Sequence, residues 1–175
     1  MKTKFILALA MSCLTLASPT RAGEQAYSAN DIVKFFDQQK QMLVTRGLCV
    51  GTDAECAQAE IKDTKSAFDL LINFEKNSAN LSEAARSNLI EFSIALKNPK
   101  LADYRFAVDG FTDASGNDDH NASLSQRRAA SVVVFLQEMG VREEALVARG
   151  WGETNFRSDD ELDPLNRRVE TRMLR

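Results

Sequence analysis

Segments with strand-like and helix-like patterns alternate between residues 67 and 174, and this alternation restricts the chain to few architectures. Dense apolar runs or strict alternation predict strands at residues 68–74, 105–109, 146–149 and 167–174. Apolar residues at helical spacing predict one helix capped by Ser82 and stopped by Pro99, and a second helix that ends at Gly140. The order βαβαβ, followed by a loop and a last strand, predicts a two-layer α/β sandwich that contains parallel pairing.

Residues 1–22 have the pattern of a secretory signal peptide. Lys2 and Lys4 precede an apolar stretch at residues 5–17, and small residues surround the expected cleavage site at residues 20–22. Cys13 does not favour a lipid anchor, because apolar residues continue past it and Ala10 stands where a lipoprotein signal usually has leucine. We therefore expect cleavage, and no later apolar run is long enough to give the mature chain a transmembrane segment.

Two cysteines, Cys49 and Cys56, remain once the signal peptide is removed. Export implies an oxidising compartment, which favours a structural disulfide between them. The alternative is a redox or metal-binding pair, but the spacing is not CxxC and no histidine lies nearby in the sequence.

The segment 23–66 is expected to form a helix, the disulfide loop and a linker ahead of the main domain. Ser28 and Asp31 provide a capping signal for a short helix that ends near Gly47. The helix carries an apolar run at residues 32–36, which we interpret as a buried face rather than an interface. Polar residues at 57–66 have the composition of a linker, so the main domain is expected to span 67–175.

The charge balance argues against nucleic acid as a partner. The chain has 22 basic and 25 acidic residues and a formal net charge of −3. The charged residues of the signal peptide are all basic, so its cleavage would leave the remaining chain with a more negative net charge. Nucleic-acid-binding domains instead gather an excess of lysine and arginine on one face.

The densest cluster of polar residues, 111–128, runs from the end of an expected strand into the following helix. Asp113 comes directly after the strand, and Arg127 and Arg128 are expected in the first two turns of the helix. Ligands of α/β sheets gather at this edge, and a cation near a helix start invites an anionic partner. That partner is either a ligand or Asp113 itself in a solvated ion pair.

A metal-dependent hydrolase is a further alternative, built on Asp113, Asp118, Asp119 and His120. The EF-hand template fails because Asp118 stands where that loop needs glycine. His120 is the only histidine, so no histidine pair for zinc exists in one chain. The sequence also has no GxSxG motif, and we expect neither catalysis nor a cofactor.

Five blocks of sequence carry a resemblance to a known family. They are 72–81 (INFEKNSANL), 108–116 (VDGFTDASG), 121–129 (NASLSQRRA), 150–153 (GWGE) and 166–170 (NRRVE). In this order and at these distances they resemble the OmpA-like C-terminal domain family, over about residues 67–175. The resemblance implies a mixed four-stranded sheet packed on helices. It also implies non-catalytic binding of peptidoglycan through the diaminopimelate residue of its stem peptide.

The resemblance also implies which residues hold the ligand. The family's anchoring aspartate falls on Asp113 and its anchoring arginine on Arg128. An acceptor anion and a forked donor suit the ammonium and the carboxylate of diaminopimelate. Family positions of lesser weight fall on Asn77, Thr112, Asn121 and Arg167.

Three of these lesser positions have structural alternatives. Asn121 has the side chain of a helix N-cap, Asn77 that of a turn residue, and Arg167 shares the alternation of the last strand. Phe111 departs from the family, which usually has histidine before the Thr-Asp step.

The sequence therefore predicts a periplasmic protein associated with the cell wall or the outer membrane, with peptidoglycan as its partner. The alternative is a module of an envelope complex whose N-terminal helix docks a protein partner. The hydrolase is a third and poorer alternative.

Overall fold

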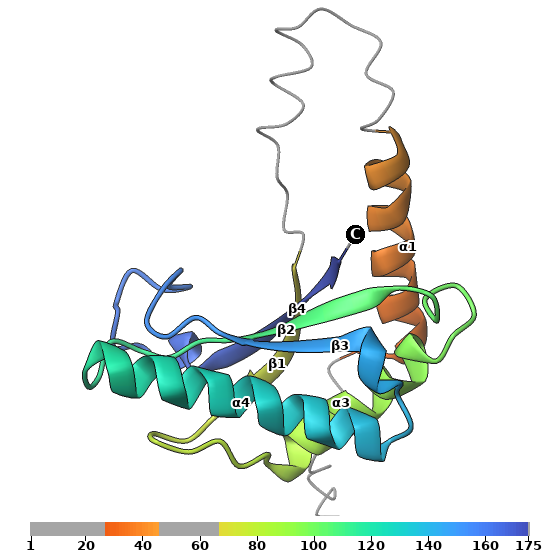
Figure 1. Ribbon diagram of the computed structural model, residues 1–175. Coiled ribbons are helices and arrows are strands. Elements are labelled where there is room, and N and C mark those ends of the chain that lie inside the picture. The colour runs from red at the N-terminus through yellow and green to blue at the C-terminus, as the bar shows by residue number, and fades with distance from the viewer. Residues whose placement is uncertain (1–26, 46–66, 175) are drawn as a thin grey trace, which may run out of the picture.

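The computed structural model describes residues 27–45 and 67–174 (Figure 1). The helices are α1 (Ala29–Thr45), α3 (Glu83–Leu96) and α4 (Asp118–Glu138), with short 3₁₀ turns η1 (Glu143–Ala145) and η2 (Pro164–Asn166). The strands are β1 (Ala67–Asn73), β2 (Arg105–Gly110), β3 (Leu146–Gly150) and β4 (Arg168–Leu174). The predicted signal peptide, the Cys49–Cys56 disulfide and the 57–66 linker lie outside the described residues. None of the helices in the described ranges is long and apolar enough to cross a membrane.

The four strands form one mixed sheet in the order β1-β4-β2-β3. The pair β2 and β3 is parallel, whereas β4 runs antiparallel to both β1 and β2. The predicted four-stranded mixed sheet with parallel pairing is therefore confirmed. The helix α4 connects β2 to the parallel strand β3. The carboxyl ends of both strands and the start of α4 therefore lie at the same end of the sheet.

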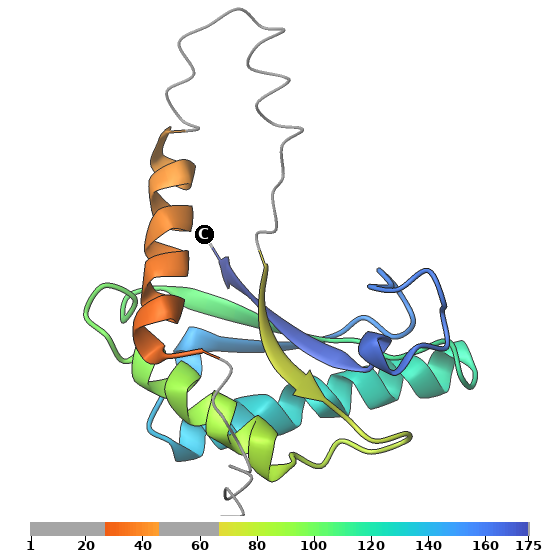
Figure 2. The same ribbon diagram turned by 180° about the vertical axis from the view of Figure 1, so that it is seen from behind.

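Helices α3 and α4 lie on one face of the sheet, and α1 stands beside α3 at one end of it (Figures 1 and 2). Phe36 of α1 is fully buried, with its ring 5.1 Å from that of Phe106 on β2. Ile32 is equally buried and Val33 nearly so, as the apolar run at 32–36 predicts. The helix α1 therefore shares a single hydrophobic core with the sheet. This core also contains Phe92 of α3.

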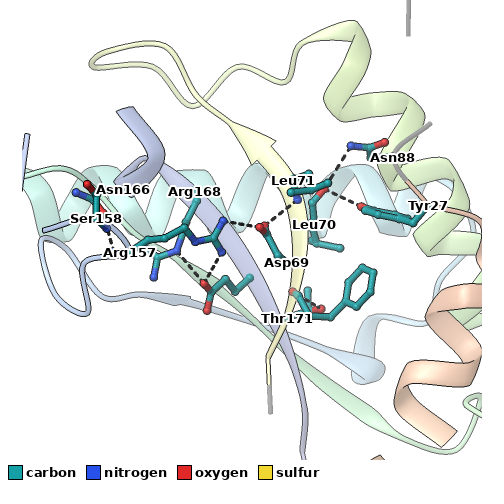
Figure 3. Close-up of polar contacts among 12 residues, drawn as sticks. Tyr27, Asp69, Leu70, Leu71, Asn88, Arg157, Ser158, Asn166, Arg168 and Thr171 are labelled. Atoms are coloured by element: carbon teal, nitrogen blue, oxygen red, sulfur yellow. Dashed lines mark hydrogen bonds and ion pairs between the residues drawn. The ribbon is translucent and has the colours of Figure 1, made fainter. Parts of the chain in front are cut away.

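Hydrogen bonds attach the start of α1 to the domain. A bulge in β1 shifts the pairing with β4 between Asp69 and Ile72, and Leu71 has a φ of 51°. The Tyr27 hydroxyl donates to the carbonyl of Leu70 in this bulge over 2.7 Å, and Asn88 of α3 also donates to it (Figure 3). The bulge thus supplies an acceptor that the β ladder does not use.

Two glycines allow α4 to lie directly against the sheet. A Cβ atom at Gly110 would lie 2.3 Å from the backbone oxygen of Ser125, and one at Gly150 would lie 2.4 Å from the backbone nitrogen of Gln126. Real Cβ atoms do not approach backbone so closely. The missing side chains therefore set how near α4 comes to the ends of β2 and β3.

Gly110→Ala is expected to lower the free energy of unfolding by about 1–3 kcal/mol, because α4 must move to admit the methyl group. Urea unfolding followed by far-UV circular dichroism measures the change. The control Ala84→Ser, at an exposed position of α3, should change it by less than about 0.5 kcal/mol. Equal stability of Gly110→Ala and wild type would contradict this close packing.

Candidate ligand-binding site

A pocket of about 310 Å³ opens between the start of α4 and the segments that follow β1 and β2. It is lined by four of the six residues predicted to bind ligand, namely Asn77, Asp113, Arg128 and Arg167. Lys76, Ser115, Gly116, His120 and Leu124 complete its wall. Thr112 and Asn121 do not line the pocket.

Asp113 is held by two neighbours within the pocket wall. Its Oδ2 accepts from Nη1 of Arg167 at 2.9 Å, and its Oδ1 accepts from both the amide and the hydroxyl of Ser115. The aspartate is 5% exposed, so this is a buried ion pair and not the solvated pair with an arginine of α4 that the sequence left open. Burial acts to raise the pKa of Asp113, but the hydrogen bonds from Ser115 and Arg167 outweigh burial and hold that pKa below its usual range.

Arg128 is fully buried and anchors backbone around the pocket. Its Nε donates to the carbonyl of Ser78 at 2.9 Å, its Nη1 to Phe111 at 3.0 Å and its Nη2 to Glu75 at 3.1 Å. These three bonds join the loop after β1 to the end of β2. A guanidinium has five N–H groups, so these three bonds leave one N–H on Nη1 and one on Nη2 unused.

The charge of Arg128 is maintained despite this burial. Removal from water lowers its pKa to about 10, the nearby cation of Arg167 acts in the same direction, and Asp113 opposes them. A guanidinium with this pKa is still protonated at neutral pH. The pocket therefore holds two arginine cations, Arg128 and Arg167, against one carboxylate.

Helix α4 begins earlier than the sequence suggested. Its N-cap is Asn117, whose Oδ1 accepts from the amide of His120 at 2.8 Å. Asn121 is therefore not the cap. It is 1% exposed and donates to Glu153 at 2.5 Å, which ties α4 to the segment after β3. With the helix starting at Asp118, Arg128 lies in its third turn and not in the first two.

The remaining predicted residues differ in their surroundings. Asn77 has a φ of 55°, as expected of a turn residue, and its position in the pocket wall leaves its side chain available to a ligand as well. Thr112 is 1% exposed, and its hydroxyl has no hydrogen-bond partner among the described residues. Arg167 directly precedes β4 and so escapes the alternation of that strand.

The loop between β3 and β4 supports the pocket from outside. Its organising residue is the fully buried Asn166, which accepts from the amide of Arg157 at 2.8 Å (Figure 3). Asn166 also donates to the carbonyl of Asp160 at 2.9 Å. The carbonyl of Glu161 in the same loop accepts from the amide of Ala114. The turn that presents Asp113 is thereby fixed against this loop.

Phe111 has a structural reason to be aromatic. The guanidinium carbon of Arg168 lies 4.2 Å from the centre of the Phe111 ring. The backbone carbonyl of Phe111 accepts from Arg128. A cation over an aromatic face is attractive, whereas a protonated histidine here would face a like charge. The departure from the usual family residue thus matches the arginine beside it.

Sequence reasoning missed Lys76 and Ser115 as residues of the pocket. A serine two positions after an aspartate is a frequent partner in local turns, so the sequence does carry a sign of Ser115. Lys76 is an exposed loop residue with no distinguishing pattern around it.

The residues of the hydrolase alternative do not gather into one centre. Asp118, Asp119 and His120 are exposed in the first turn of α4, whereas Asp113 is buried. Within residues 27–45 and 67–174, no three His, Cys, Asp or Glu side chains lie close enough to hold a metal ion.

The lowered pKa of Asp113 predicts a pH-dependent contribution to stability. A carboxylate with a depressed pKa stabilises the fold above its unfolded-state pKa of about 4, and that contribution is lost as the pH falls through the folded-state pKa. Asp113→Asn should therefore cost about 2 kcal/mol at pH 7 and much less near pH 2.5. Urea unfolding of both proteins at the two pH values measures this, and a gap that stays constant would contradict the ion pair.

The model of the OmpA family matches residues 73–170. Outer membrane protein A of Shigella flexneri is 33% identical over 116 residues, which cover 66% of this chain and 33% of that protein. The corresponding protein of Citrobacter freundii is 35% identical over 102 residues, covering 58% of this chain and 42% of the relative. The chain thus spans less than half the length of these relatives.

Solved structures share the fold at low sequence identity. The OmpA-like domain of FopA1 from Francisella tularensis is 23% identical with a TM-score of 0.55, covering 60% of this chain and 69% of that domain. The C-terminal domain of Helicobacter pylori MotB is 24% identical with a TM-score of 0.54, over 59% and 83% of the two chains. The peptidoglycan-associated lipoprotein of Burkholderia pseudomallei is 23% identical with a TM-score of 0.52, over 59% and 88%.

Proposed function

The chain belongs to the OmpA family, and from this premise we propose that it binds peptidoglycan without catalysing a reaction, through the diaminopimelate residue of the stem peptide. The observation that carries the proposal is the presence of Asp113, Arg128 and Arg167 in one pocket of about 310 Å³. The side chain of diaminopimelate ends in an amino-acid head group, with one ammonium and one carboxylate on the same carbon. The pocket offers charges of both signs within a small volume.

The contacts of the pocket suggest how each group of the ligand is held. The ligand ammonium would bind the carboxylate of Asp113, whose oxygens already accept from Arg167 and Ser115. The ligand carboxylate would take the two remaining N–H groups of Arg128, and the amide of Asn77 lies in the same wall. Asp113 and Arg167 hold each other in place before binding, so little side-chain freedom is lost when the ligand enters.

The balance of charge also suits this ligand. Lys76, Arg128 and Arg167 line the pocket against the single carboxylate of Asp113. A pocket with surplus positive charge attracts a ligand with more carboxylates than amines. Stem peptides that carry diaminopimelate meet this requirement, because they contain further carboxylates from glutamate and from the peptide terminus.

The proposed location of the protein, at the cell wall in the periplasm, rests on the sequence. A cleaved signal peptide at residues 1–22 would deliver the protein to the periplasm, where the Cys49–Cys56 disulfide would form. A single head group contacts few residues, so firm attachment to the wall would depend on many copies of the ligand along the polymer. We propose that the protein is held at the cell wall in this way.

The structure does not favour the alternative, in which the N-terminal helix docks an envelope partner. The apolar run 32–36 was expected to carry that contact. Its residues Ile32, Val33 and Phe36 are buried in the core, and Phe35 packs partly buried against the same core. A partner could reach Ile32, Val33 and Phe36 only after α1 had left the core.

Titration of the protein with a diaminopimelate-containing muropeptide, followed by NMR, tests the proposal. Chemical shifts should change at Asn77, Asp113 and Arg167 in wild type. Asp113→Asn should weaken binding roughly tenfold or more, because a hydrogen bond between charged groups is worth about 1.5–3 kcal/mol.

The matched control is Arg127→Gln. Arg127 neighbours Arg128 in sequence, but it is exposed and donates to Ser123 on the surface of α4. Its substitution should leave affinity unchanged. Absence of shifts in wild type at millimolar ligand, or equal binding by Asp113→Asn, would refute the proposal.

A further inference from the structure

His120 is the only histidine of the chain, and it lines the pocket that contains Asp113. It lies in the first turn of α4, where its amide donates to the N-cap residue Asn117 at 2.8 Å. Its ring is close to the turn that follows Asp113, because a Cβ atom added to Gly116 would lie 3.6 Å from Cδ2 of His120. The residue as a whole is exposed. The imidazole therefore borders both the solvent and the pocket.

The spacing of residues along α4 relates His120 to the buried base of the pocket. His120, Leu124 and Arg128 follow one another at intervals of four residues, so they lie on one face of the helix, and all three line the pocket. Leu124 is 5% exposed and Arg128 is fully buried. The rise of a helix places His120 about 12 Å along the axis from Arg128. A peptide held at Arg128 would extend outward along this face and pass near His120.

Charged groups surround His120 in the pocket wall and in its own helical turn. They are Lys76, Asp113, Arg128 and Arg167 in the wall, with Asp118 and Asp119 beside His120 in the first turn of α4. The two acids of the turn do not line the pocket. Among the described residues, the imidazole takes part in no ion pair. Its charge would therefore act on the contents of the pocket.

The other charges of the pocket stay constant near neutral pH. Burial acts to raise the pKa of Asp113, but hydrogen bonds from Ser115 and Arg167 hold that pKa below its usual range. Burial lowers the pKa of Arg128 to about 10, which still leaves it protonated at pH 8. Histidine is the side chain that ordinarily gains a proton between pH 8 and pH 5. The lining, with three cations and one carboxylate, thus gains a fourth cation as the pH falls.

We propose that His120 makes binding at this pocket depend on pH, and that its protonated form favours anionic ligands over neutral ones. The proposal rests on the function proposed above. The head group of diaminopimelate has one positive and one negative charge, so the added cation acts on whatever further carboxylates the ligand carries. An exposed charge pair is weak and is screened by salt, so the expected effect on affinity is about two- to fivefold.

Two tripeptides that end in diaminopimelate test this proposal. In one, the carboxylates outside the side-chain head group are free, and in the other they are amides. Both peptides are acetylated at the N-terminus, so that no group of the peptide titrates between pH 5.5 and pH 8.0. NMR titration of the protein at these two pH values measures the four affinities.

Wild type should bind the anionic peptide about two- to fivefold more tightly at pH 5.5 than at pH 8.0. Its affinity for the amidated peptide should be the same at both pH values. Equal affinity for the anionic peptide at the two pH values would overturn the proposal. An equal pH dependence for the amidated peptide would also overturn it, because the ligand's negative charge would then have no part in the effect.

Two variants fix the charge at this exposed position. His120→Gln is neutral at both pH values and should bind the anionic peptide as weakly as wild type does at pH 8.0. His120→Lys is positive at both and should bind it as tightly as wild type does at pH 5.5. A His120→Gln protein that keeps the pH dependence of wild type would refute the proposal, because another group would then be responsible.

The same coupling is measurable at the imidazole itself. Because the chain has one histidine, its ring signals in an NMR titration come from His120 alone. Coupling between two binding events is reciprocal, so saturation with the anionic peptide should raise the titration midpoint of this ring by about 0.3–0.7 pH units. A midpoint that the bound peptide leaves unchanged would contradict the proposal.

The outcomes separate this inference from the function on which it rests. If wild type binds neither peptide at either pH, the proposed function is wrong and the role of His120 is refuted with it. If wild type binds both peptides without any dependence on pH, the pocket function stands and the role of His120 alone is refuted.

Discussion

The guanidinium of Arg128 holds together three segments that the rest of the pocket depends on. It donates to two carbonyls of the loop after β1 and to one at the end of β2, while its own backbone belongs to α4. Phe111 is buried, so its carbonyl depends on this donor, whereas the carbonyl of Glu75 also accepts from the amide of Ser78 in the turn after β1. The three bonds leave from three different nitrogens, which a guanidinium has and the single ammonium nitrogen of a lysine does not, so the arrangement suits the planar fork of arginine.

Close packing between α4 and the sheet places Arg128 correctly. Gly110 and Gly150 let the helix approach until its backbone nearly touches theirs, and Phe111 follows immediately with its carbonyl toward Arg128. The guanidinium of Arg168 lies over the Phe111 ring, and Arg167 reaches Asp113. Three arginines thus have three different roles within one small region: tying backbone, covering an aromatic ring and pairing with the acid of the pocket.

Much of the fold was predictable from the sequence, because its elements carry regular patterns and clear boundaries. Ser82 caps α3 as expected, accepting from the amide of Ala85, and the alternation of β4 is visible in its sequence. The start of α4 was misplaced because Asn121 resembles a cap, while Asn117 lies in a run of small polar residues that has no helical periodicity.

The different contacts that the arginines of this region make could not be predicted from the sequence. Arg128 was expected to bind ligand, but its environment depends on where the loop after β1 meets α4, and loops leave no periodic pattern in a sequence. Arg167 was expected either to bind ligand or to follow the alternation of the last strand, but it lies between the η2 turn and β4 and pairs with Asp113. The apolar run of α1 predicted that one face of this helix is buried. It did not predict that the helix packs beside α3.

The central claim is that Asp113 and Arg128 together receive the head group of diaminopimelate. A crystal structure of the mature protein with a diaminopimelate-containing tripeptide tests this most directly. The account predicts the ligand ammonium within hydrogen-bonding distance of Asp113, the ligand carboxylate on Arg128, and the three backbone bonds of Arg128 unbroken. A ligand bound elsewhere, or one that contacts neither residue, would contradict it.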